Sequence, residues 1–117
     1  MSSTQFQITR NCATLLLPRD FGGNDAVEIR NNLLESLHKL PKVNGVILDC
    51  SNLTLIDRLD LKQLLDTIHC IHLMGKKIGF CSIGASLAAV LVNLNADLDH
   101  CYFGVNIDDA MGKLEDR

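Results

Sequence analysis

Apolar residues form two short β-rich runs near the start of the chain, between Gln5 and Leu17. Runs of this length are typical of strands, and Pro18 ends the second one. The polar pair Arg10 and Asn11 separates the runs, as a tight turn would. The pattern therefore predicts a β-hairpin.

A helix is predicted next, because apolar residues recur three and four positions apart after a turn at residues 21–23. Asn24 or Asp25 is expected to cap its first turn, and Pro41 sets its limit. The expected buried face comprises Val27, Ile29 or the stem of Arg30, Leu33, Leu34 and Leu37.

The middle of the chain repeats the order of strand and helix. Residues 43–50 form an apolar run that includes Asp49, which is typical of a central strand buried on both faces. Gly75 is expected to end the helix that follows, and residues 78–82 form the next strand. The apolar face of this second helix comprises Leu61, Leu64, Leu65, Ile68 and either Ile71 or His72.

A third helix is expected to start at residues 84–86 and to end at Asn95, followed by a short strand at residues 101–103 and a last helix over residues 108–115. The third helix would bury Leu87, Val90, Leu91 and Leu94, and the last one Ala110, Met111 and Leu114.

This order predicts an α/β fold, with a mostly parallel sheet, an N-terminal antiparallel edge hairpin and about four helices in a single domain over residues 1–117. Function gathers beyond the carboxyl ends of central strands in such sheets. The leading candidate is therefore the loop at residues 50–58.

Composition narrows the function classes. The 117 residues carry a formal charge of 11 − 14 = −3, so a nucleic-acid partner is not expected. No run approaches the roughly 18 apolar residues that span a bilayer, and residues 1–8 lack the features of a signal peptide. We therefore expect a cytoplasmic protein without a membrane partner.

The five cysteines occur singly inside apolar runs, without a C-x-x-C pair, and are expected to be buried thiols rather than a disulfide framework. His69, Cys70 and His72 share a helix but lack a fourth metal ligand, so a half-exposed or satisfied histidine is the favoured interpretation. His100 and Cys101 would point to opposite faces of a strand and cannot form a catalytic dyad.

The sequence contains no phosphate-binding loop for ATP, and we predict no cofactor, no metal and no catalytic residue. Asp49, Asp57 and Asp60 could be imagined around a metal in an enzyme, but no nucleophilic partner accompanies them. Asp57 is more simply a helix cap.

Three stretches carry a resemblance to a known family: DCSNLTLID at residues 49–57, LMGKK at 73–77 and IGFCSIG at 78–84. Together with residues 87–94 and 107–110, they resemble STAS domains, the fold of anti-sigma-factor antagonists. Within that family the chain is most similar to the small single-domain scaffold antagonist of the bacterial stressosome.

The resemblance implies a phosphorylation switch directly after Asp57, where the family usually has a serine or threonine that a partner kinase phosphorylates. A phosphate there adds about −1.5 to −2 charges to the docking surface. This chain has Arg58 at the phosphosite-equivalent position, so the switch is absent or moved to another hydroxyl. Such hydroxyls are Ser51, Thr54, Ser82 and Ser86. The simpler alternative is that Arg58 is a solvated surface side chain.

The family further implies a non-catalytic scaffold and antagonist in a general stress response. Its partners would be co-scaffold STAS proteins with sensory domains and a serine/threonine switch kinase, in a large homo- or hetero-oligomer. The expected partner-binding residues are Ser51, Asn52, Thr54, Asp57, Arg58, Leu59 and Asp60.

A ligand-binding STAS module is the alternative hypothesis. Arg58, Lys76 and Lys77 would then hold a nucleotide or an anionic lipid, although a lysine pair before a strand is more often a solvated turn.

Overall fold

The computed structural model describes residues 6–21, 23–55 and 57–115. Its five-stranded sheet has the order β1-β2-β3-β4-β5, with β1 antiparallel to β2 and all other pairs parallel. The predicted fold class is confirmed. The elements are β1 (Phe6–Thr9), β2 (Cys12–Leu16), α1 (Gly23–His38), β3 (Gly45–Asp49), α2 (Arg58–Leu73), β4 (Lys77–Cys81), α3 (Ala85–Asn93), β5 (Cys101–Gly104) and α4 (Ile107–Glu115).

The hairpin turn lies where it was predicted, since Arg10 and Asn11 have φ values of 51° and 64° and Thr9 pairs with Cys12. Two successive residues with positive φ give the turn a twist that matches the flanking strands. The predicted strand start at Gln5 falls outside the described residues.

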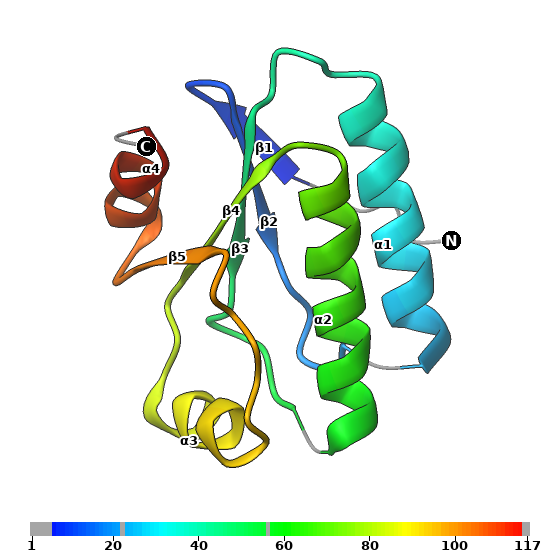
Figure 1. Ribbon diagram of the computed structural model, residues 1–117, viewed down its shortest axis with the longest axis vertical. Coiled ribbons are helices and arrows are strands. Elements are labelled where there is room, and N and C mark those ends of the chain that lie inside the picture. Colours follow the sequence, from blue (N-terminus) through cyan, green and yellow to red (C-terminus); the bar gives the residue numbers. More distant parts are fainter. Residues whose placement is uncertain (1–5, 22, 56, 116–117) are drawn as a thin grey trace.

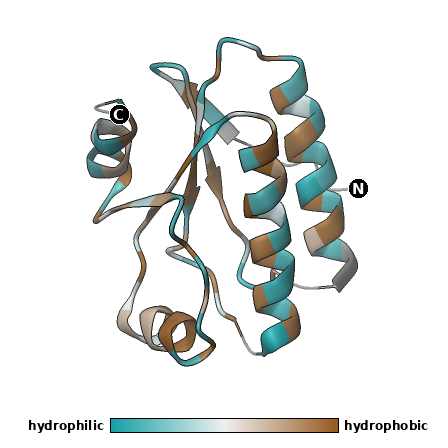
Figure 2. Cartoon of the chain, viewed as in Figure 1, coloured by the Kyte–Doolittle hydropathy of each residue, from teal (hydrophilic) through white to brown (hydrophobic). Residues whose placement is uncertain are grey.

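Two layers of helices cover the sheet. Figure 1 shows α1 and α2 side by side on one face, α4 on the opposite face, and α3 at the end of the sheet where β4 finishes. The strands are largely apolar, and α1 and α2 carry apolar and polar stripes (Figure 2). The amphipathic spacing in the sequence thus corresponds to helices with one face on the sheet.

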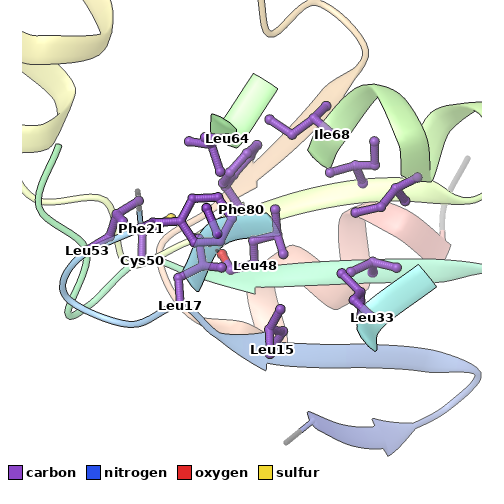
Figure 3. Close-up of a cluster of buried hydrophobic side chains, with 14 of the residues drawn as sticks. Leu15, Leu17, Phe21, Leu33, Leu48, Cys50, Leu53, Leu64, Ile68 and Phe80 are labelled. Atoms are coloured by element: carbon purple, nitrogen blue, oxygen red, sulfur yellow. Dashed lines mark hydrogen bonds between the residues drawn. The ribbon is translucent and has the colours of Figure 1, made fainter. Parts of the chain in front are cut away.

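The main core lies between the sheet and the α1–α2 layer, where the side chains of Leu17, Phe21, Leu48 and Phe80 converge (Figure 3). β3 is buried on both faces as predicted: Leu48 belongs to this core, whereas Ile47 packs under α4. Alternate residues of a strand point to opposite faces, which explains the division.

Some predicted boundaries and core positions were wrong by small amounts. α1 begins at Gly23, so Asp25 lies in its first turn rather than at a cap, and Ala26 is fully buried where Val27 is only half-buried. β4 covers residues 77–81 instead of 78–82, because Ser82 has a φ of 62° and leaves the strand conformation.

Helix ends follow their predicted stop residues closely. Gly75 has a φ of +78° directly after the C-cap of α2, and Asn95 has a φ of 58° just beyond α3. Both are residue types that tolerate the left-handed conformation. On α2, Ile71 is buried and His72 is exposed, which settles the choice between them.

Among the described residues, α4 is the helix that covers the second face of the sheet, over three glycines on adjacent strands, Gly45, Gly79 and Gly104. A Cβ at Gly45 or Gly79 would meet the Leu114 side chain at 3.1 Å or 3.5 Å. The absence of side chains at these positions lets the helix approach the sheet. Ala110, Met111 and Leu114 are buried there, as predicted.

Candidate functional site

The loop between β3 and α2 is fixed to the sheet at its start. The Cys50 N–H donates to the carbonyl of Cys81 on β4 at 3.0 Å, and the Ser51 N–H donates to Asp49 Oδ1 at 3.0 Å. The Leu53 N–H closes a turn on the Cys50 carbonyl at 3.1 Å. Asp49 therefore binds the local backbone.

The second half of this loop is anchored by buried apolar side chains and by a hydrogen bond to the connection between β2 and α1. Leu53 and Leu55 are buried, and the Thr54 N–H donates to the Arg19 carbonyl at 2.9 Å. Asn52 and the Thr54 side chain are exposed. The loop thus has an apolar inner side and a polar outer side, which is a rigid base for a surface contact. Residue 56 lies outside the described part of the chain.

Asp57 caps α2, as predicted. It has extended backbone angles (φ −149°, ψ −175°), and its Oδ1 accepts the Asp60 N–H at 3.0 Å. A carboxylate here accepts one of the N–H groups that have no acceptor within the helix, and it lies at the positive end of the helix dipole. The side chain is exposed, so the cap also contributes negative charge to the surface.

Replacing Asp57 with alanine is expected to lower the free energy of unfolding by about 1 kcal/mol, because the Asp60 N–H loses its acceptor. Asp57→Asn, which keeps a side-chain oxygen, should lose only a fraction of that. Urea denaturation followed by circular dichroism measures both variants. Equal losses for the two would contradict the capping role.

Arg58 is the first residue of α2, and its side chain is exposed. Its neighbour Leu59 is an apolar side chain with 58% of its surface exposed, and Asp60 is half-buried. A cation at a helix N-terminus interacts unfavourably with the dipole by a few tenths to about 1 kcal/mol. Stability therefore gives no reason for an arginine here, whereas arginine is one of the residue types enriched in interface hot spots.

The structure brings most of the predicted site residues to one surface. Six are exposed in and around this loop, and the seventh, Asp60, is half-buried. We call this surface the α2 entry surface; it comprises Ser51, Asn52, Thr54, Asp57, Arg58, Leu59 and Asp60. The grouping of these residues agrees with the prediction, while their binding role stays a prediction.

The predicted anion site that combines Arg58 with Lys76 and Lys77 is wrong. Arg58 begins α2, whereas the two lysines follow its end. A helix of 16 residues is about 24 Å long, so these cations cannot hold one small ligand.

The structure gives no support to a metal centre formed by Asp49, Asp57 and Asp60. The first two carboxylates accept backbone N–H groups of the loop and the helix start. Within residues 6–21, 23–55 and 57–115, no group of three His, Cys, Asp or Glu side chains is placed to hold a metal ion. Over the same ranges, no helix has the length and apolar character to cross a membrane.

The cysteines are free thiols, and three of them are buried: Cys12, Cys50 and Cys81. Burial raises the pKa of Cys50 to about 12, with Cys81 and Asp49 adding to the effect, and burial raises the pKa of Cys101 to about 11. Since the thiolate is the nucleophile, these two residues are unreactive near neutral pH. Cys70 and Cys101 are only half-buried, which the sequence pattern did not distinguish.

The sheet order, the α1–α2 layer and the single α4 on the opposite face make up the STAS fold of anti-sigma-factor antagonists. No family model and no curated protein matches the chain by sequence. Among solved structures, a serine-to-glutamate variant of Moorella thermoacetica RsbS superposes with a TM-score of 0.76 at 18% identity, covering 98% of this chain and 97% of that one.

Two further structures extend the comparison. A protein chain in a structure of the stressosome, which is described as a signal integration and transduction hub, gives a TM-score of 0.75 at 18% identity. The match covers 96% of each chain. The anti-sigma factor antagonist SpoIIAA in its unphosphorylated form gives 0.66 at 11% identity, covering 96% of this chain and 97% of that one. At these identities the likeness establishes the fold.

Proposed function

We propose that this chain is a non-catalytic STAS scaffold and antagonist protein of a stressosome-type assembly in the cytoplasm. It binds co-scaffold STAS proteins that carry sensory domains and a serine/threonine switch kinase. Support comes from the fold, which it shares over nearly the full length of both chains with RsbS and with a stressosome component. The absence of a recognisable catalytic motif in the sequence is consistent with a binding role.

The observation that carries the proposal is the α2 entry surface. It presents Arg58 and Leu59 at the start of α2, beside the Asp57 cap and after a loop that is hydrogen-bonded to β4 and to the connection between β2 and α1. A rigid surface loses little entropy on binding, which favours specific recognition. We assign the kinase contact to this surface.

Arg58 gives this surface a fixed positive charge at the phosphosite-equivalent position. Arginine has no hydroxyl and stays protonated, so it neither accepts phosphate nor imitates it. Under this proposal the charge at position 58 is fixed, so phosphorylation cannot switch the contact that Arg58 makes. Ser51 and Thr54, both exposed, are the remaining hydroxyl side chains of the α2 entry surface.

Reversing the charge at this position tests the kinase contact. Arg58→Glu is expected to change the affinity for the cognate switch kinase at least about tenfold in calorimetry, because it replaces the central charge of the surface. Lys42→Glu is the matched control: it makes the same charge change at an exposed residue between α1 and β3, at the opposite end of the sheet. Equal responses of the two variants would contradict the assigned surface.

Assembly is tested separately by co-expression with a sensory-domain STAS protein, followed by light scattering and electron microscopy. A megadalton particle that contains both chains is the expected result. If the chain stays monomeric and forms no complex with the kinase or the co-scaffold protein, the proposed function is wrong, although the fold is unaffected.

A further inference from the structure

A cavity of about 400 Å³ lies at the opposite end of α2 from the α2 entry surface. It is lined by residues from the end of α2, the turn into β4 and the segment that enters β5. Cavities of this size accept small molecules. The residues that line it are not adjacent in the sequence, and nothing in the proposed scaffold function uses them.

Two imidazole rings form one wall of this cavity. His72 and His100 stack with their ring centroids 4.7 Å apart and their planes inclined by 16°. The stack joins α2 to the segment before β5, so each ring restrains the other. An imidazole can donate an N–H in its neutral and in its charged form, which makes the pair suitable for holding an acceptor-rich ligand.

The turn after α2 brings Lys76 to the lining of the cavity. The left-handed Gly75 lets the chain reverse, and the N–H groups of Gly75 and Lys76 donate to the His72 and Ile71 carbonyls at 2.9 Å and 3.4 Å. These bonds satisfy two of the carbonyls at the end of α2. Lys76 Nζ donates one hydrogen bond, to the Val43 carbonyl, and an ammonium has three N–H groups.

Two further charged residues line the cavity. Lys77 also lines it, with its Nζ donating to the Leu114 carbonyl at 3.0 Å, and Asp99 is the carboxylate on its wall. The charged side chains of the lining are therefore those of two lysines and one aspartate. Tyr102 completes the lining.

We propose that this cavity binds a phosphate group, either as inorganic phosphate or as a phosphate monoester of a small molecule. Phosphate supplies the oxygen acceptors that ammonium and imidazole N–H groups require, and bonds between charged partners are the strongest of this type. The Lys76 ammonium and the His72–His100 pair hold the phosphate, and Asp99 weakens its binding.

The test follows the histidine ring signals by nuclear magnetic resonance while inorganic phosphate or glycerol 3-phosphate is added to the full chain. Saturable shifts of His72 and His100 are expected with at least one of the two. Similar affinities would identify free phosphate as the ligand, and an affinity at least about tenfold higher for glycerol 3-phosphate would identify a monoester.

Variants make the assignment specific. Lys76→Ala should weaken binding about tenfold or more, since it removes a charged hydrogen-bond donor. Asp99→Asn should strengthen it several-fold, because a repelling carboxylate is lost while the size of the side chain is kept. Lys62→Ala, at an exposed lysine of α2 that pairs with Asp66, is the matched control and should leave binding unchanged.

The proposal is overturned if neither ligand shifts the two histidines. It is also overturned if Lys62→Ala weakens binding as much as Lys76→Ala, or if Asp99→Asn fails to strengthen it. Circular dichroism of each variant verifies the fold. Because the cavity lies at the other end of α2, none of these results bears on the contacts of the α2 entry surface.

Discussion

Gly104→Ala is expected to destabilise the protein by about 3 kcal/mol or more, as measured by urea denaturation. A Cβ at this position of β5 would lie 2.3 Å from the backbone nitrogen of Ala110 and 2.7 Å from its Cα. The obstacle is the backbone of α4, which cannot rotate away as a long side chain could. The substitution therefore forces the helix off the sheet.

The cost is large because α4 is the cover of the second sheet face. Its buried side chains pack on Cys12, Ile47 and Cys81, and lifting the helix would expose them. Peripheral contacts also hold it, including Lys113 to the Phe103 carbonyl and the Arg10–Glu115 ion pair at 3.5 Å. An exposed pair of this kind contributes at most about 1 kcal/mol and cannot compensate for the lost packing.

Gly112→Ala is the matched control, made in the same helix. A Cβ there meets nothing within 4 Å, and removing a glycine from a helix interior stabilises it by about 0.5–1 kcal/mol. The two alanine substitutions should therefore have opposite signs. A loss at Gly112 similar to that at Gly104 would mean that α4 is intolerant of change in general, and the close approach would not be the cause.

The elements were predictable from the sequence where one residue type forces a local conformation. Pro18 follows β2 closely, Gly75 takes the left-handed conformation after α2, and Arg10 with Asn11 forms the hairpin turn. Each acts through its own backbone preferences and needs no distant contact. The apolar stripe of α2 was predicted for the same reason, because its spacing depends only on helix geometry.

Features that depend on tertiary contacts were not predictable in this way. A glycine within a strand pattern has several explanations, so the close approach of α4 to Gly104 could not be inferred before the helix was placed. The His72–His100 stack joins two elements that are remote in the sequence. The separation of Arg58 from Lys76 likewise required the full length of α2 to be known.

The candidate loop was predictable because its position depends on topology. A loop that follows a central parallel strand lies at the carboxyl edge of the sheet, and Asp57 is a residue type that caps helices. The outward direction of Arg58 and Leu59 agrees with that position. The partner in the proposed function is an inference from the family resemblance, since neither the loop nor its charge specifies one.

Alkaline pH is expected to destabilise the protein through Cys50. Burial raises the pKa of its thiol from 9.0 to about 12, so the thiol ionises at a lower pH in the unfolded chain than in the folded one. The stabilising contribution is complete below about pH 9 and is lost progressively as the pH rises towards 12. The free energy of unfolding should fall by about 1.4 kcal/mol per pH unit in this window on account of Cys50, or about 4 kcal/mol in total.

A Cys50→Ala variant isolates this contribution, because all other titratable groups are the same in both proteins. The variant is expected to be less stable at neutral pH, because loss of the buried sulfur leaves a small cavity, yet its stability should fall less steeply above pH 9. Cys101→Ala should flatten the curve over a narrower range, since the pKa of Cys101 is raised only to about 11. Parallel urea titrations from about pH 8 to about pH 12 measure all three proteins. Identical slopes for the wild type and Cys50→Ala would show that the buried thiol ionises without unfolding the chain around it, and the core beside β3 would then have to admit water.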